Sequence, residues 1–238
     1  MKKKAFTLAE VLITLGIIGV VAALTMPALI ANYQKKIYVT QLKKTYVAFQ
    51  QAFLQYKAEN GLDSVDDLSN YNNITPFITS QFKGAEICSV TTPAPCFADS
   101  YTHLNGDMMI DDPMYPNNNS VSCFRLLDGT SACIGILGWY TYTDISGTHP
   151  QGSIIVDING RKGPNVIGRD AFRFMYYADG SVDAAYATPE CKRDDQYCTK
   201  YSGDLSTVYS GMGASCLTVA DYDRCFNRII ADGWKMTY

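Results

Sequence analysis

The chain has 238 residues, of which 47% are hydrophobic, and a formal net charge of −3. This length suits one compact domain with a core of its own. Residues 1–60 hold eight of the 20 Lys and Arg but only Glu10 and Glu59 among the 23 acids, so residues 61–238 carry a formal charge of −9. Phosphate binding needs Lys and Arg, so the acidic remainder argues against a general nucleic-acid surface, and we predict no nucleic-acid partner.

The N-terminus combines a basic start with an uncharged apolar run. Three lysines at residues 2–4 precede 21 residues, Val11–Ala31, that contain no charged side chain. A helix of about 20 apolar residues is long enough to cross the roughly 30 Å of hydrocarbon in a bilayer. Lysines at one end of a membrane helix favour an orientation in which that end lies on the cytoplasmic side. The pattern therefore predicts a single-pass membrane helix over residues 11–31, with the rest of the chain outside the cytoplasm.

Glu10 stands at the entrance to this apolar run. Placing an ionisable group inside a membrane helix costs free energy, so such a residue usually has a function. A carboxylate in this position is expected to pair with a cation. One such partner is the free amino terminus of a neighbouring copy of the same helix. That pairing requires a new N-terminus close to Glu10, which predicts cleavage near Phe6.

Residues 2–27 read KKKAFTLAEVLITLGIIGVVAALTMP. This segment resembles the N-termini of prepilins and pseudopilins, the subunits of type IV pili and type II secretion systems. The resemblance implies that a prepilin peptidase cuts between Ala5 and Phe6 and methylates the new amino terminus. It also implies that Glu10 pairs with a neighbour's amino terminus during assembly, and that Pro27 kinks the helix. Ala5 departs from the family, in which Gly usually precedes the cut.

Two other interpretations of the N-terminus remain open. A secretory signal peptide also has a basic start and an apolar core, and residues 21–23 approximate its cleavage site. Such a core is normally shorter and contains no Glu. An uncleaved membrane anchor is the other interpretation.

The apolar pattern predicts one long helix over residues 6–60. After Pro27, hydrophobic residues recur every three or four positions, and Gly61 is a plausible stop; the stripe consists of Val39, Leu42, Tyr46, Phe49, Phe53 and Tyr56. This second half of the helix is amphipathic and should pack on the chain's own globular domain. Pro27 lacks an N–H donor, so we expect a kink or a short melted segment after it.

Residues 61–238 form the predicted globular domain, and residues 1–5 the leader. Short helices are expected at residues 65–68 and 74–80. Strand signals follow at residues 108–110, 121–127, 130–137, 139–143, 153–158, 172–178 and 181–185. Asp128-Gly129 and Asp179-Gly180 mark hairpins. A helix over residues 217–231 and a terminal strand at 234–238 complete the prediction. The fold class is α+β, with the helix packed on an antiparallel sheet as in pilins.

Eight cysteines, an even number, indicate disulfides formed in an oxidising compartment. They are Cys88, Cys96, Cys123, Cys133, Cys191, Cys198, Cys216 and Cys225. Eight cysteines allow 105 pairings, and nearest-neighbour pairing is the simplest. A zinc site is the alternative, but the chain has no Cys-x-x-Cys and only two histidines, His103 and His149.

Residues 157–170 are the best candidate for a ligand site in the domain. Asp157, Asn159, Asn165 and Asp170 offer oxygen atoms to a hard cation such as calcium, and some pseudopilins hold calcium in a loop of this domain. The same segment contains three positively charged side chains, Arg161, Lys162 and Arg169, which argue against the binding of a metal ion. The competing interpretation is a connection held by hydrogen bonds from side chains to the backbone.

The sequence predicts a structural protein and contains no catalytic motif. The first hypothesis is a minor pilin or pseudopilin of a type IV pilus or type II secretion-like filament. It would sit in the bacterial inner membrane before assembly and in a filament, in the periplasm or at the cell surface, afterwards. Its partners would be prepilin peptidase, membrane lipid, and copies of itself or of other pilins. The alternative is a membrane-anchored binding or adhesion module that does not assemble.

Overall fold

The protein is described by a computed structural model for residues 7–89, 96–108, 121–144, 147–198, 204–217 and 222–238. It divides into two compact units, Met1–Ile37 and Tyr38–Tyr238. The first unit is helical, and the second contains a sheet together with the remaining helices.

The long helix α1 spans Leu8–Asn60, which confirms the predicted helix. It ends where Gly61 adopts a φ of +62°, a conformation that glycine reaches without steric cost. The Leu62 N–H donates to the Lys57 carbonyl at 3.0 Å. This is the hydrogen bond of a Schellman motif, so the predicted stop at Gly61 has a local geometric cause.

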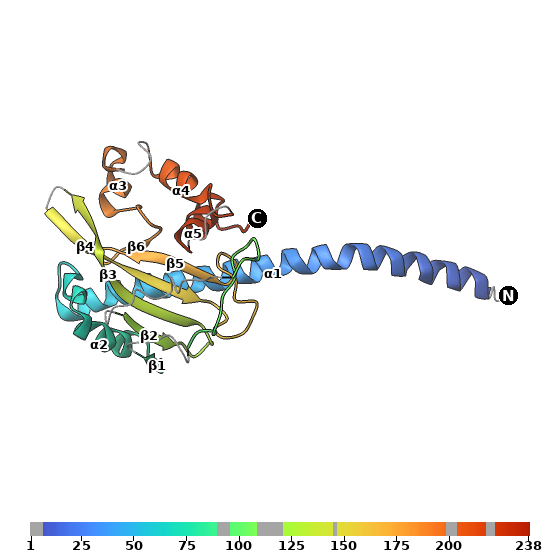
Figure 1. Ribbon diagram of the computed structural model, residues 1–238, viewed down its shortest axis with the longest axis horizontal. Coiled ribbons are helices and arrows are strands. Elements are labelled where there is room, and N and C mark those ends of the chain that lie inside the picture. Colours follow the sequence, from blue (N-terminus) through green and yellow to red (C-terminus); the bar gives the residue numbers. More distant parts are fainter. Residues whose placement is uncertain (1–6, 90–95, 109–120, 145–146, 199–203, 218–221) are drawn as a thin grey trace, which may run out of the picture. The chain divides into compact units, whose positions relative to one another are not determined.

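The unit Tyr38–Tyr238 contains the other elements (Figure 1). In chain order they are η1 (Asp66–Ser69), α2 (Tyr71–Gln81), β1 (Glu86–Ser89), β2 (Val121–Arg125), β3 (Ser131–Asp144), β4 (Gly147–Asp157), β5 (Ala171–Tyr176), β6 (Val182–Asp183), α3 (Pro189–Arg193), η2 (Asp195–Tyr197), α4 (Leu205–Gly213) and α5 (Tyr222–Ala231).

The six strands form one antiparallel sheet in the order β1-β2-β3-β4-β5-β6. Both predicted Asp-Gly turns are confirmed. In each, the glycine has a positive φ, +90° at Gly129 and +81° at Gly180. The closing hydrogen bonds, Leu126 to Thr130 and Tyr177 to Ser181, enclose three residues rather than two. This pattern is that of a three-residue hairpin with glycine in the left-handed position.

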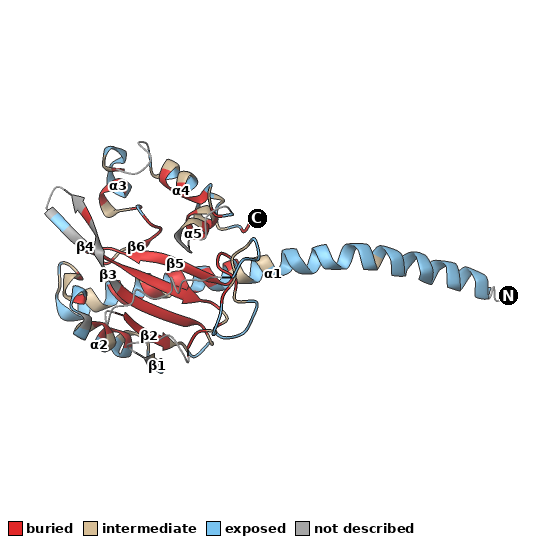
Figure 2. Cartoon of the chain, viewed as in Figure 1, coloured by how far each residue is buried: buried red, intermediate tan, exposed pale blue. Residues whose placement is uncertain are grey.

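The second half of α1 packs on one face of the sheet and forms the main core. Phe49 and Phe53 are completely buried. The Phe49 ring lies 5.7 Å from Phe174, and the Phe53 ring is stacked 4.8 Å from Tyr176. Figure 2 shows the sheet as largely buried. The amphipathic stripe read from the sequence is therefore the face that α1 presents to its own domain.

The opposite face of the sheet is covered by a second hydrophobic cluster. Phe97 and Tyr101 lie there against Cys123, Cys133 and Ile155. Because both faces are covered, β2 and β5 are buried almost along their whole length. This arrangement brings Tyr101 to the end of β4, next to Asp157.

Several boundaries differ from the prediction. β3 is one strand of 14 residues in place of two predicted strands. The elements β1, α3 and α4 were not predicted. The predicted strand at 234–238 is wrong, since these residues form no strand. Trp234 has a φ of +60°, and its N–H donates to Ile229 O at the end of α5, so the chain turns there instead of extending. Residues 109–110 of another predicted strand lie outside the described residues.

Candidate functional site

The start of α1 is closed by hydrogen bonds between Thr7 and Glu10. The Thr7 N–H and the Thr7 hydroxyl each donate to Glu10 Oε2 at 2.8 Å. In return, the Glu10 N–H donates to Thr7 Oγ1 at 3.3 Å. This reciprocal pattern is a capping box, which satisfies N–H groups that have no partner within the helix. Ala5 and Phe6, the predicted processing site, lie outside the described residues.

The first half of α1 exposes its apolar side chains. α1 is long and apolar enough to cross a membrane, and none of its most apolar window is buried. Its exposed large residues include Leu12, Ile13, Ile18, Leu24 and Leu29. Because water is a poor solvent for such a surface, this segment needs an apolar environment, either lipid or other protein. Figure 2 shows the exposure of this part of the helix.

Pro27 lies inside α1, and the helix continues through it without a break. The structure therefore has no melted segment at Pro27, which was one of the two expected alternatives. Proline in a helix removes one backbone hydrogen bond, but the other bonds of the helix keep the chain helical on both sides. The kink itself stays a prediction.

The eight cysteines form four pairs, each between neighbours in the sequence. They are Cys88–Cys96, Cys123–Cys133, Cys191–Cys198 and Cys216–Cys225, with Cα–Cα distances between 4.0 and 5.6 Å. Cys123 and Cys133 are directly opposite in the β2–β3 ladder, because the hairpin loop has three residues. The described residues include no free cysteine. Disulfides of this kind are typical of exported proteins.

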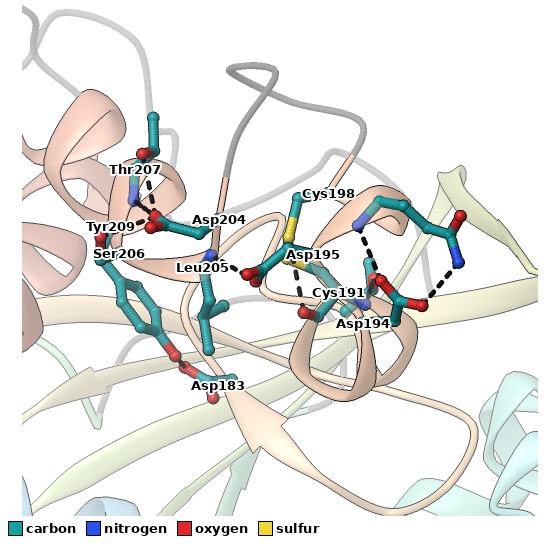
Figure 3. The surroundings of a disulfide bond; sticks show 12 residues. Asp183, Cys191, Asp194, Asp195, Cys198, Asp204, Leu205, Ser206, Thr207 and Tyr209 are labelled. Atoms are coloured by element: carbon teal, nitrogen blue, oxygen red, sulfur yellow. Dashed lines mark hydrogen bonds between the residues drawn. A yellow bond between two sulfur atoms is a disulfide. The ribbon is translucent and has the colours of Figure 1, made fainter.

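Asp183 joins α3 and α4 to the edge strand β6. Its carboxylate accepts the Ala184 N–H at 2.6 Å and the Tyr209 hydroxyl at 3.0 Å, and it forms an ion pair with Lys192 at 2.7 Å. Figure 3 shows Asp183 and Tyr209 beside the Cys191–Cys198 disulfide. These contacts fix α3 and α4 on the sheet, a structural role that the sequence pattern did not reveal.

The acids around that disulfide act as helix caps. Asp194 accepts the Gln196 N–H at the start of η2, and Asp204 accepts the Thr207 N–H at the start of α4. Asp195 accepts the Leu205 N–H (Figure 3). Side-chain oxygens at these positions satisfy the free N–H groups of a helix start. Their placement is therefore explained by local structure.

The structure brings Asp157 and Asp170 together at the two ends of the β4–β5 loop. Both side chains are completely buried. Asp157 accepts the Tyr101 hydroxyl at 2.5 Å and the Asn159 N–H at 3.1 Å, each on a different oxygen. Asp170 accepts the N–H groups of Asn165 and Val166 at 2.8 and 2.6 Å. Each of the four carboxylate oxygens therefore has a donor from the chain itself.

Burial dominates the electrostatics of this loop. Burial, partly offset by the Tyr101 hydrogen bond and reinforced by the Asp170 charge, raises the pKa of Asp157 to about 7. Burial also raises the pKa of Asp170, although its backbone hydrogen bonds oppose the change. Desolvation disfavours a charged carboxylate, so this part of the fold favours a protonated Asp157 at neutral pH and below.

The cation site stays a prediction. Two observations bear on it in opposite directions. The amide oxygens of Asn159 and Asn165 are buried and accept no hydrogen bond from the described residues, which fits a missing ligand. However, the carboxylates of Asp157 and Asp170 are already engaged by donors. Among the described residues, no three His, Cys, Asp or Glu side chains are grouped to hold a metal ion.

Thr7 is the functional residue that the sequence reasoning missed. The motif Thr-x-x-Glu before an apolar helix is a readable capping-box signal, and residues 7–10 match it. The carboxylate both caps α1 and stands at the edge of the exposed apolar segment.

Comparison with known proteins identifies two family models and a relative. A family model described as a family of unknown function (DUF6613) matches residues 28–238, and one described as the prokaryotic N-terminal methylation motif matches residues 1–26. The protein named prepilin peptidase-dependent protein D, from Escherichia coli K12, is 28% identical over 125 residues, which are 51% of this chain and 80% of that protein. No solved structure matches the chain.

Proposed function

The chain belongs to DUF6613, a family of unknown function, and we propose that it is a structural subunit of a pilin-like filament, a minor pilin or pseudopilin of a type IV pilus or a type II secretion-like machine. The observation that carries this proposal is the methylation motif over residues 1–26, which includes Glu10 at the start of an exposed apolar helix. A carboxylate at the entrance to an apolar helix has a function if a cationic group forms an ion pair with it.

Processing by prepilin peptidase is the first step of the proposal. The methylation motif and the name of the Escherichia coli relative support it. Cleavage between Ala5 and Phe6 removes the leader, residues 1–5. The new amino terminus then lies one residue before Thr7, so processing leaves the capping box between Thr7 and Glu10 intact.

Pairing of Glu10 with a neighbouring subunit is the second step. Glu10 Oε2 accepts both hydrogen bonds from Thr7, whereas Oε1 accepts none from the described residues. Oε1 is thus available to the methylated amino terminus of an adjacent copy or of another pilin. In an apolar environment an unpaired charge is strongly disfavoured. The ion pair therefore determines the register of the two helices more than it strengthens their association.

The membrane is the proposed location before assembly. Residues 11–31 span the bacterial inner membrane once, and the disulfide-bonded domain, residues 61–238, lies outside the cytoplasm. The four cysteine pairs support an oxidising compartment. On assembly the apolar helix segments leave the lipid and pack against one another. They then form the core of a filament in the periplasm or at the cell surface. The size of the domain favours a minor subunit.

The N-terminal mass of the protein purified from membranes tests the proposal. We expect a chain that starts at Phe6 with one added methyl group. A start at Met1 would leave only a membrane anchor and would favour a tethered binding or adhesion module. A start beyond Ala22 would indicate a secreted protein, and either result would overturn filament assembly as the function.

A further inference from the structure

Each of the four disulfides closes a short loop between consecutive cysteines. In chain order, the paired cysteines are 8, 10, 7 and 9 positions apart. Cys123 and Cys133 face each other across one hairpin, and Cys191 in α3 pairs with Cys198 at the end of η2. Every pair therefore belongs to one local segment, and its formation needs no cysteine from another part of the domain.

The folded domain leaves little access to these sulfur atoms. Seven of the eight cysteines are buried, and Cys88 is half-buried. The rate of thiol–disulfide exchange depends on access to the sulfur atom that is attacked. A wrong pair that is enclosed by folding therefore persists until the domain unfolds again. It follows that the correct pairs have to form before the domain closes around them.

Proximity in the sequence supplies only part of the required selectivity. The free energy of closing a flexible loop rises with the logarithm of its length. Cys198 and Cys216, the closest cysteines of different pairs, are 18 positions apart. Loop closure therefore favours the native pairs on either side of them by roughly three- to fourfold. A preference of that size leaves many chains with a wrong bond if all eight thiols are oxidised at once.

The order in which the cysteines leave the membrane removes this competition. In the proposed topology, residues 11–31 span the membrane with the N-terminus inside, so the domain emerges in chain order. Cys191 and Cys198 are then both outside before Cys216 appears. If the earlier pairs are already closed, no third thiol competes for these two. Pairing of consecutive cysteines is the result expected when oxidation keeps pace with emergence.

We propose that a thiol oxidase carrying a reactive disulfide closes the four pairs in chain order as they emerge, and that no disulfide isomerase takes part. The inference rests on the proposed function, because it requires an N-terminal membrane anchor and an exported domain. In each step, one cysteine thiolate attacks the disulfide of the oxidase and forms a mixed disulfide. The second thiolate of the pair then attacks the mixed disulfide and forms the bond within the chain. The oxidase leaves as a dithiol that has gained two electrons and two protons from the pair.

Disulfide mapping of the full chain, exported in bacterial cells, tests the proposal. Cells with both enzymes are compared with cells that lack the periplasmic thiol oxidase and with cells that lack the disulfide isomerase. Free thiols are blocked by alkylation before lysis, and the peptides are mapped by mass spectrometry without reduction. We expect the four native pairs to form equally well without the isomerase and to decrease roughly fivefold or more without the oxidase.

Two single substitutions distinguish ordered pairing from unordered pairing. In Cys133→Ser, Cys123 has no partner until Cys191 emerges, so these two are joined wrongly and the next two cysteines after them as well. The native pair Cys216–Cys225 should therefore decrease roughly threefold or more in cells without the isomerase and recover when it is present. Cys225→Ser is the matched control, because it also removes a buried cysteine but leaves only Cys216 without a partner. Its other three pairs should form with or without the isomerase.

Three results would overturn the proposal. They are a loss of native pairs from the unaltered chain in cells without the isomerase, complete pairing in cells without the oxidase, and equal behaviour of the two variants. If all eight cysteines stay free even in cells with both enzymes, the domain is not exported. That result would contradict the proposed location and not the order of pairing, so the two failures are distinguishable.

Discussion

Thr7 and Glu10 cap the N-terminus of α1 by exchanging hydrogen bonds, with Thr7 as the donor of two bonds at 2.8 Å and Glu10 as the donor of one at 3.3 Å. The same carboxylate is the proposed partner of a neighbour's amino terminus. Glu10 therefore combines a structural role, which needs only an acceptor oxygen, with an assembly role, which needs a negative charge. The two roles can be separated by substitution.

Glu10→Gln should reduce incorporation into filaments while leaving α1 capped. Glutamine keeps the acceptor oxygen that a capping box requires but carries no charge. We expect incorporation to fall roughly tenfold or more, which corresponds to about 1.4 kcal/mol of lost pairing. Thr7→Val should weaken the cap by about 1 kcal/mol and reduce incorporation less, because Glu10 stays charged.

The measurement is the ratio of filament-bound to membrane-bound subunit in sheared cell fractions. Glu59→Gln is the matched control, since Glu59 lies in the same helix and accepts hydrogen bonds from Gln55 and Gln81 on the surface. Normal incorporation of Glu10→Gln would show that the charge of Glu10 has no part in assembly.

Phe53→Ala should destabilise the domain far more than the neighbouring substitution Leu54→Ala. Phe53 is completely buried, and its ring is stacked 4.7 Å from Phe77 and 4.8 Å from Tyr176. Loss of such a ring leaves a cavity and typically costs about 3–5 kcal/mol. Leu54 is 58% exposed, and a surface change of this kind alters stability by about 0.5 kcal/mol at most. Urea unfolding of the full chain in detergent micelles measures both. Similar losses for the two variants would contradict the helix face described here.

Gly152→Ala should also destabilise the domain, through a clash rather than a cavity. A Cβ atom at Gly152 would lie 1.9 Å from the Tyr176 ring, which faces it across the β4–β5 ladder. Tyr176 would have to leave its place against Phe53, and overpacking of this kind costs about 1–3 kcal/mol. Gly163→Ala is the control, because its Cβ would meet nothing within 4 Å. Equal unfolding midpoints for Gly152→Ala and the unaltered protein would refute the clash.

Calcium should leave the thermal stability unchanged. The carboxylate oxygens of Asp157 and Asp170 already accept hydrogen bonds from the chain, so a cation would have to replace those donors. Midpoints measured in calcium and in EDTA should agree within about 1 °C, since a bound ion at saturating concentration would stabilise the fold. A clear rise in calcium that is lost in Asp170→Asn would establish the predicted cation site and revise this expectation.

The parts of the fold that the sequence predicted are those with a strong local signal. Gly61, Gly129 and Gly180 each adopt the positive φ that their turns require, so glycine marked one helix end and two hairpins correctly. The stripe on α1 was readable because the buried residues between Val39 and Phe53 keep the same face toward the sheet over about four turns of helix.

The parts that failed depend on distant packing. The terminal residues have high strand propensity, but Trp234 packs 5.3 Å from Tyr46 on α1, and Tyr238 donates to Gly168 O in the β4–β5 loop. Contacts between side chains so far apart in the sequence produce no local sequence pattern. The strand β1 and the helix α3 have only four and five residues, too few for a period to appear.

Of the two candidate sites, one had a local sequence signal and the other depended on distant packing. Glu10 was identified from its charge in an apolar segment, whereas the burial of Asp157 and its bond to Tyr101 required the fold. The two partners, Asp157 and Tyr101, lie 56 positions apart in the sequence. No spacing rule connects them, because a segment that crosses the far face of the sheet brings Tyr101 to the end of β4.

Asp157 should make the domain less stable as the pH rises toward neutral. Burial raises its pKa to about 7 in the folded protein, against 3.8 as the ordinary value. The folded state therefore binds the proton more tightly than the unfolded chain, so this contribution to stability is complete below about pH 4 and disappears as the pH rises to about 7. The shift corresponds to roughly 4 kcal/mol. In urea unfolding with EDTA, the unaltered protein should lose about that much relative to Asp157→Asn between pH 4 and pH 8. Parallel pH profiles for the two proteins would mean that Asp157 ionises in the fold as it does in water.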